Sequence, residues 1–306
     1  MAQIAKAHAA QQAAAEAQAF EATVAVLKSV RHDAATPVDW QAALNAPAPS
    51  APRYSQEFEA DAQRKLDGFQ PTFFERIFGS AKRRAALAKD LQTARESDRL
   101  RFEQWQQQYA QAYQVWDARR RLAHGVLSGD AEAYRQALDA SDAFDELEEL
   151  GSVARVEHLG AELVEVDVFV NSDAVIPPDI KTVTSTGKLS TKKMPVGQFY
   201  ELYQDYVCGS ALRVARDVFA VLPVTRVHVH AIAEMLNPQT GHLEHSAILS
   251  VAMPRETIAR LRFEGLDASD SMRNFVHNMK FKKTAGFAVV EPLALEETLV
   301  SRNPGA

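Results

Sequence analysis

The chain has 306 residues, 46% of them hydrophobic and 24% charged, which is ordinary for a folded globular protein and suggests two domains. The net charge of −6 argues against a general polyanion-binding protein, and the single cysteine, Cys208, excludes an internal disulfide and a multi-cysteine zinc site. No run approaches the about 18 apolar residues of a membrane-spanning helix, and the first residues lack the apolar core of a secretion signal, so we expect a cytoplasmic protein with no membrane association.

Residues 1–45 predict an Ala-rich helical segment. Strong helix formers dominate residues 2–30, although the apolar face of that helix is thin. Thr36 and Pro37 have the residue types of a helix N-cap and first turn, which predicts a short helix ending near Trp40. Residues 46–53 follow with three prolines, so we expect an extended linker.

Residues 54–151 predict a helical arm domain. We expect Ser55 to cap a helix that ends near Gly68, followed by a short aromatic helix over residues 71–78. Residues 80–128 contain no proline and predict one helix of roughly 48 residues, about 70 Å long. Two short helices, 130–139 and 141–150, complete the domain.

The long helix has an 11-residue rhythm. The positions of one stripe recur in 4-3-4 spacing, and all of them except Asp98 are apolar or aromatic: Leu87, Leu91, Ala94, Asp98, Phe102, Trp105, Tyr109, Tyr113 and Trp116. This spacing corresponds to about 3.67 residues per turn, so the stripe stays nearly straight along the helix, as in a coiled coil. A helix of this length requires a partner along it. We therefore predict protein–protein interaction or self-association through five aromatic residues: Phe102, Trp105, Tyr109, Tyr113 and Trp116.

Residues 152–293 predict an α+β domain, followed by a loose tail over residues 294–306. The periodicity predicts a hairpin of residues 153–158 and 162–170, a short strand at 179–184, a buried helix at 195–220, and a second hairpin of residues 224–236 and 242–253. Helices at 254–261 and 270–279 and a strand at 287–290 complete it. In the second hairpin we expect a five-residue turn that pairs Leu236 with His242, and an exposed polar face that carries His228 and His230.

One set of acidic residues resembles the metal site of a nuclease. Asp167 lies on a predicted strand, and Asp179 and Lys181 form an acid-x-Lys pattern on the next. Metal-dependent nucleases of the restriction-endonuclease-like fold use this order, in which carboxylates hold Mg²⁺ and the lysine assists the attacking water. The resemblance covers about a third of the chain. The alternative interpretation is two exposed strand residues and a charged turn.

Two groups of lysines favour phosphate contacts if they converge in space. They are Lys188, Lys192 and Lys193 in one group, and Lys280, Lys282 and Lys283 in the other. Solvated charge on exposed loops is the more ordinary interpretation of these lysines. The two histidines at 228 and 230 could bind zinc only with a third ligand from another strand, and their ordinary interpretation is hydrogen-bonded residues on a wet sheet face. Glycine-rich nucleotide motifs are absent, so we expect no cofactor.

These patterns favour a non-enzymatic interaction or scaffold protein with a helical assembly arm and a partner-binding α+β domain. Its partner is another protein or a second copy of the chain, and nucleic acid is a weaker possibility. The alternative is a Mg²⁺-dependent nuclease that uses Asp167, Asp179 and Lys181.

Overall fold

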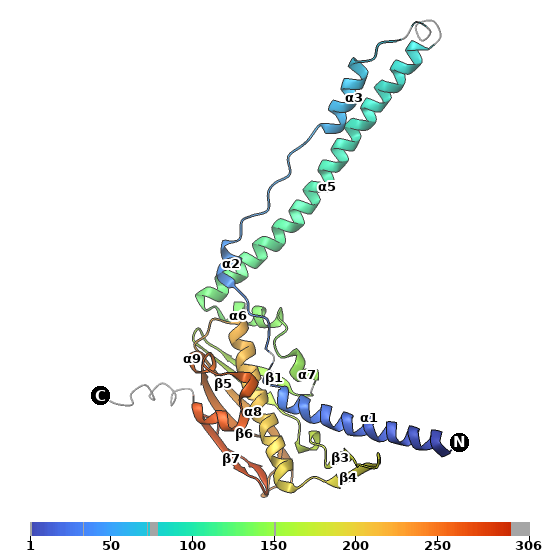
Figure 1. Ribbon diagram of the computed structural model, residues 1–306. Helices are drawn as coiled ribbons and strands as arrows, with labels where there is room; N and C mark the ends of the chain where they lie inside the picture. Colours follow the sequence, from blue (N-terminus) through green and yellow to red (C-terminus); the bar gives the residue numbers. More distant parts are fainter. Residues whose placement is uncertain (1, 33, 72, 74–78, 150, 295–306) are drawn as a thin grey trace. The chain divides into compact units, whose positions relative to one another are not determined.

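The contacts of the chain divide it into two units (Figure 1). The computed structural model describes residues 2–32, 34–71, 73, 79–149 and 151–294. Residues 41–124 form one unit, here called the arm unit, and residues 1–40 with 125–306 form the other, called the sheet unit. This division differs from the predicted boundaries after residues 45 and 151, because the N-terminal helix and the helices after residue 130 pack within the sheet unit.

The arm unit is built on one long helix. Helix α5 (Ser80–Ser128) has 49 residues and confirms the predicted helix; its last turn belongs to the sheet unit. An extended segment, residues 46–56, and helix α3 (Glu57–Asp67) run alongside it (Figure 1). Most of the aromatic helix expected over residues 71–78 lies outside the described residues.

Helix α3 is capped by a side chain of α5 rather than by Ser55. The carboxylate of Asp98 accepts the backbone N–H groups of Phe58 at 3.3 Å and Glu59 at 2.8 Å. Asp98 is 1% exposed and pairs with the Arg101 guanidinium at 3.2 Å. A negative charge at this position satisfies free N–H groups of the first turn and stabilises the helix dipole. The predicted cap at Ser55 is therefore wrong.

The sheet unit confirms the predicted α+β class. Its main sheet has six strands in the order β1-β2-β5-β6-β7-β8, and its one parallel pair is β2 with β5. The strands are β1 (Val153–Leu159), β2 (Leu163–Phe169), β5 (Arg226–Leu236), β6 (Leu243–Pro254), β7 (Val276–Lys282) and β8 (Gly286–Ala288). A separate two-stranded sheet contains β3 (Asp179–Val183) and β4 (Leu189–Lys193).

Helix α8 (Val196–Val221) is the centre of this unit. It packs on strands β2, β5 and β6, and also contacts α1 (Ala2–Ser29), α6 (Ala131–Asp139) and α10 (Ala268–Ser271). Most residues of α8 from Leu202 to Val221 are buried, as predicted. The remaining short elements are α2 (Trp40–Asn45), α7 (Asp145–Glu149), η1 (Asp173–Val175), α9 (Arg255–Ile258), η2 (Phe263–Gly265) and η3 (Met272–Asn274). Of the described helices, none is both long and apolar enough to cross a membrane.

Three charged residues hold the second half of α8 in place. Asp217 is fully buried and accepts the backbone N–H groups of Ala35 at 2.7 Å and Phe144 at 3.3 Å, while Arg213 donates to the same carboxylate at 2.9 Å. Arg255 donates to the carbonyl oxygens of Phe219 at 3.0 Å, Leu222, and Val224 at 2.7 Å. A guanidinium suits the carbonyl groups left free at a helix C-terminus.

Three details of the predicted elements are wrong. The hairpin of β5 and β6 pairs Leu236 with Leu243 across a six-residue loop, and a bulge near Ile232 shifts the pairing further. The helix expected at 270–279 is instead α10, η3 and strand β7, because residues 276–279 pair with β6. The short helix expected to end at Trp40 begins there. Strand β4 was not predicted.

Candidate functional site

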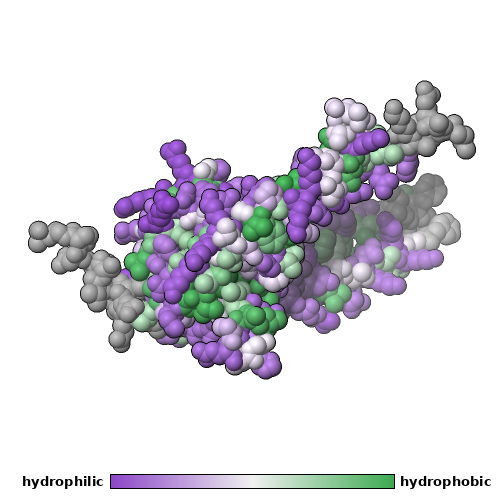
Figure 2. Space-filling view, turned by 90° about the horizontal axis from the view of Figure 1, so that it is seen from below, coloured by the Kyte–Doolittle hydropathy of each residue, from purple (hydrophilic) through white to green (hydrophobic). Residues whose placement is uncertain are grey.

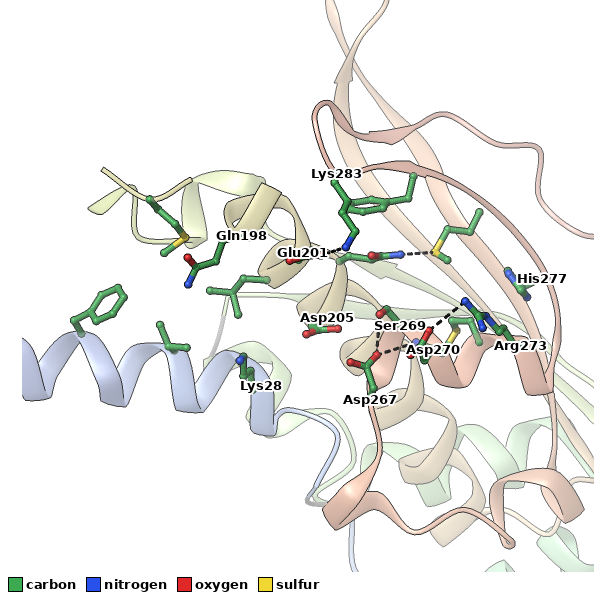
Figure 3. A pocket seen from close by; sticks show the side chains of 18 residues that line it. Lys28, Gln198, Glu201, Asp205, Asp267, Ser269, Asp270, Arg273, His277 and Lys283 are labelled. Carbon is green, nitrogen blue, oxygen red and sulfur yellow. Dashed lines mark hydrogen bonds and ion pairs between the residues drawn. The ribbon is translucent and has the colours of Figure 1, made fainter. Parts of the chain in front are cut away.

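A cavity of the sheet unit lies between α1, α8, α10 with η3, and β7 (Figure 3). Its volume is about 660 Å³. Because these four elements come from distant parts of the chain, the cavity forms only when the sheet unit is folded.

Apolar and thioether side chains make up part of the lining. They include Val24 of α1, Leu202 of α8, and three of the six methionines of the chain, Met194, Met272 and Met279. The sulfur of Met279 lies 4.0 Å from the Sγ atom of Cys208, whose pKa is raised by burial. Methionine is flexible and polarizable, so this wall can adapt to ligands of different shape.

Two ion pairs lie at the sides of the cavity. Lys283 of the β7 end pairs with Glu201 of α8, and Arg273 of η3 pairs with Asp270 of α10 at 3.4 Å. Each pair neutralises one carboxylate of the lining. Figure 3 shows both pairs, with Asp205 and Asp267 below the Lys283–Glu201 pair.

The pKa values of Asp205 and Asp267 are shifted in opposite directions. Burial raises the pKa of Asp205, and the negative charge of Asp267 raises it further. Burial also acts to raise the pKa of Asp267, but hydrogen bonds from the Asp270 and Ser269 backbone and from the Ser269 hydroxyl outweigh it and lower that pKa. Asp267 Oδ1 accepts from Asp270 N at 2.9 Å and from Ser269 Oγ at 2.8 Å. At Asp205, burial and the charge of Asp267 outweigh the Ser269 hydrogen bond and the positive charges of Lys28 and Arg31, which act to lower its pKa.

A search against protein-family descriptions, curated proteins and solved structures finds no match to this chain. The function of the cavity must therefore be inferred from its own residues.

The predicted nuclease residues lie in different sheets. Asp167 is on β2 of the main sheet, whereas Asp179 and Lys181 are on β3 of the small one. Lys181 pairs with Glu16 of α1 at 3.0 Å. The strand next to β2 in the nuclease arrangement would carry the acid-x-Lys pattern, but here the neighbours of β2 are β1 and β5. Within the described part of the chain, no group of three or more His, Cys, Asp or Glu residues could hold a metal ion.

All six predicted anion-binding lysines are exposed: Lys188, Lys192, Lys193, Lys280, Lys282 and Lys283. Strand β4 ends shortly before the start of α8, and Lys283 contacts the first turns of the same helix through Glu201, so both groups approach the α8 N-terminus. Figure 2 looks onto this end of the unit, where mostly hydrophilic side chains surround smaller hydrophobic patches. Phosphate binding by these lysines stays a prediction.

The expectation that His228 and His230 are exposed is wrong. Their exposed fractions are 0% and 3%. His230 Nδ1 lies 2.8 Å from Ser250 Oγ, and its Nε2 lies 2.7 Å from Glu165 Oε1. This order resembles an activated serine nucleophile, but Ser250 is fully buried and its Oγ also accepts the Leu293 N–H at 2.9 Å. The chain of hydrogen bonds therefore attaches the C-terminal segment to the sheet.

The predicted aromatic interaction residues contact the extended segment of the same chain. Trp116 Nε1 donates to Ala46 O at 2.8 Å, and the Phe102 and Tyr54 rings meet edge to face with centroids 5.3 Å apart. Trp105 and Tyr109 line a shallow hollow of about 360 Å³ with prolines of the segment. Trp105 and Tyr113 nevertheless keep 42% and 41% of their surface exposed. Part of the surface of these rings therefore packs against residues 46–54 of the same chain.

Sequence reasoning missed Asp205 and Asp267. The available signal for Asp205 was a carboxylate on a helix predicted to be mostly buried. For Asp267 the residue type was informative, because an aspartate followed by Ala-Ser-Asp is a strong helix cap.

Proposed function

We propose that this protein is a non-enzymatic assembly protein, in which the arm unit pairs with the arm unit of a second copy. One observation carries the proposal. From residue 80 to residue 122 of α5, a stretch described throughout, only Leu91 and Asp98 are buried. A helix of this length is stabilised mainly by packing of an apolar face, and this one packs little of its surface within its own chain.

The uncovered face of α5 is opposite the aromatic residues. At 100° per residue, Leu100 and Val115 lie about 60° apart around the helix and roughly opposite Phe102 and Tyr109. Leu100 is 52% exposed and Val115 is 69% exposed. Large apolar side chains exposed on one face of a helix favour association.

The pattern along this face is self-complementary. In an antiparallel pair with its two-fold axis between Gln107 and Gln108, Leu100 of one copy meets Val115 of the other. The same register places Gln104 opposite Gln111, and the outer pairs are Thr93 with Leu122 and Ser97 with Ala118. Such an isologous interface is the commonest in homodimers. It places apolar side chains against each other and leaves the glutamine amides to hydrogen-bond.

The mass of the purified protein tests the proposal. We expect light scattering to give a dimer, and the double variant Leu100→Glu, Val115→Glu to give a monomer, because each of the two contacts between positions 100 and 115 would then bring two negative charges together. The matched control, Gln92→Glu with Gln106→Glu, adds the same charges on exposed positions outside this face and should remain dimeric. A wild-type monomer at about 100 µM would overturn the proposal.

Cross-linking tests the register. In the double variant Leu100→Cys, Val115→Cys, oxidation should link two chains, because the two positions of one chain are about 22 Å apart along the helix and cannot bond to each other. Each single variant should cross-link poorly. Efficient dimers from Leu100→Cys alone would indicate a parallel pair instead. The native thiol, Cys208, is buried and should not compete.

A further inference from the structure

The cavity between α1, α8, α10 and β7 has the size of a small-molecule site. Binding cavities for small ligands have volumes of roughly 300–1,000 Å³ and combine apolar walls with a few convergent polar groups. This cavity, of about 660 Å³, has both features. We infer that it binds a small organic cation, whose ammonium group lies between Asp205 and Asp267 and whose apolar body contacts Met272 and Met279.

Charge favours a cation over an anion. The side chains of Arg273 and Lys283 already pair with Asp270 and Glu201. Among the described residues, Asp205 forms no ion pair, and its raised pKa reflects burial beside the charge of Asp267. An ammonium group between the two carboxylates would relieve their repulsion and form charge-assisted hydrogen bonds to both.

An organic cation fits better than a metal ion. The described residues offer no group of three or more His, Cys, Asp or Glu side chains that could hold a metal. One oxygen of Asp267 already accepts two hydrogen bonds from its own helix turn. The methionine side chains would make no favourable contact with a hydrated metal ion, whereas they would bury the hydrocarbon part of an amine.

The ammonium group of Lys28 on α1 competes with a bound amine for the position beside Asp205. Its positive charge lowers the pKa of Asp205, which places its ammonium group near that carboxylate, and its side chain is exposed. Figure 3 shows Lys28 on the α1 side of the cavity, below Asp205. A bound amine would replace Lys28 as the positive charge beside Asp205. Replacing Lys28 by an uncharged residue should therefore strengthen amine binding.

The methionines provide a direct assay. We would label the methionine methyl groups with ¹³C and titrate the full chain with phenethylamine at pH 7, followed by NMR. We expect the signals of Met272 and Met279 to shift and those of Met235 and Met253, which do not line the cavity, to stay fixed. Phenethyl alcohol and phenylacetate, which keep the ring without the ammonium, should bind at least about tenfold more weakly.

Variants connect the shifts to the proposed contacts. Asp205→Asn should weaken phenethylamine binding by about tenfold or more, whereas Glu256→Gln, with the same charge change at an exposed position, should leave it unchanged. Lys28→Met should strengthen binding, and Val24→Trp should block it by filling the cavity.

Several results would overturn the inference. They are equal binding of amine and alcohol, an unchanged dissociation constant in Asp205→Asn, and shifts that include Met235 and Met253. The inference does not depend on the assembly proposal, because the same titration can be made with the monomeric arm variant.

Discussion

His228 should make the stability of the sheet unit strongly dependent on pH between about 7 and 4. It is fully buried on β5, where burial and then the positive charge of His230 lower its pKa from 6.5 to about 4, while Glu165 opposes the change. In the unfolded chain the imidazole takes up a proton near pH 6.5, but in the folded unit it stays neutral until about pH 4. The unfolded state therefore binds more protons in this range, and stability falls as the pH is lowered.

The size of the effect follows from the difference of about 2.5 pH units. At 1.36 kcal/mol per unit, His228 should remove about 3 kcal/mol of unfolding free energy between pH 7 and pH 4. The variant His228→Gln has no imidazole at this position. Between pH 7 and pH 4 it should therefore lose about 3 kcal/mol less unfolding free energy than the wild type. We would measure urea unfolding at four pH values by tryptophan fluorescence.

The assay needs a reporter in the sheet unit alone. Trp40 is 9% exposed there and donates to Val221 O at 2.5 Å, whereas Trp105 and Trp116 belong to the arm unit. Replacing the latter two by phenylalanine in every protein compared leaves Trp40 as the only indole. His242→Gln, an exposed change in the β5–β6 loop, is the matched control and should follow the wild type. Parallel pH profiles for the wild type and His228→Gln would refute the reasoning.

Three further changes test the charged residues that hold the elements together. Asp98→Ala removes the acceptor for two N–H groups of α3 and should cost the arm unit about 1–3 kcal/mol in urea unfolding, whereas Asp90→Ala, at an exposed position of α5, should cost less than about 0.5. Asp217→Ala leaves a buried arginine without its carboxylate and should destabilise the sheet unit by about 3–5 kcal/mol, while the exposed Asp139→Ala should have little effect. Arg255→Lys keeps the charge but cannot span three carbonyl groups, so we expect a loss of about 1–3 kcal/mol in the same assay; an unchanged midpoint would contradict this account of the α8 terminus.

Local patterns predicted the elements whose stabilising contacts are close in sequence. Helix α5 was predictable because good helix formers continue from Ser80 without a proline, and the β1–β2 hairpin because its apolar residues alternate. Where distant contacts decide the structure, the prediction failed. The cap of α3 comes from Asp98, about 40 residues further along the chain, so no local pattern could have indicated it.

The candidate cavity illustrates the same limit. Lys28, Asp205 and Asp267 come from three elements far apart in sequence, and no spacing rule relates them. The polar residues of β5 alternate as on a solvent-facing strand, but His228 and His230 are buried, and Leu293 of the C-terminal segment donates to Ser250, the hydrogen-bond partner of His230. Residues 272–279 contain apolar residues at helical spacing, yet pairing with the edge of β6 selects a strand.

The discontinuous sheet unit has a consequence for synthesis on the ribosome. Helix α1 leaves the ribosome before the rest of the sheet unit. Lys181, the partner of Glu16, is translated 165 residues later, and Asp217, the partner of Ala35, is translated 182 residues after Ala35. At about 5–20 residues per second the delay is roughly 10–40 s. Contacts within residues 41–124 span far shorter separations and can form earlier. Helix α1 is thus translated well before the residues that hold it in the sheet unit, and it must remain unpaired with them during that interval.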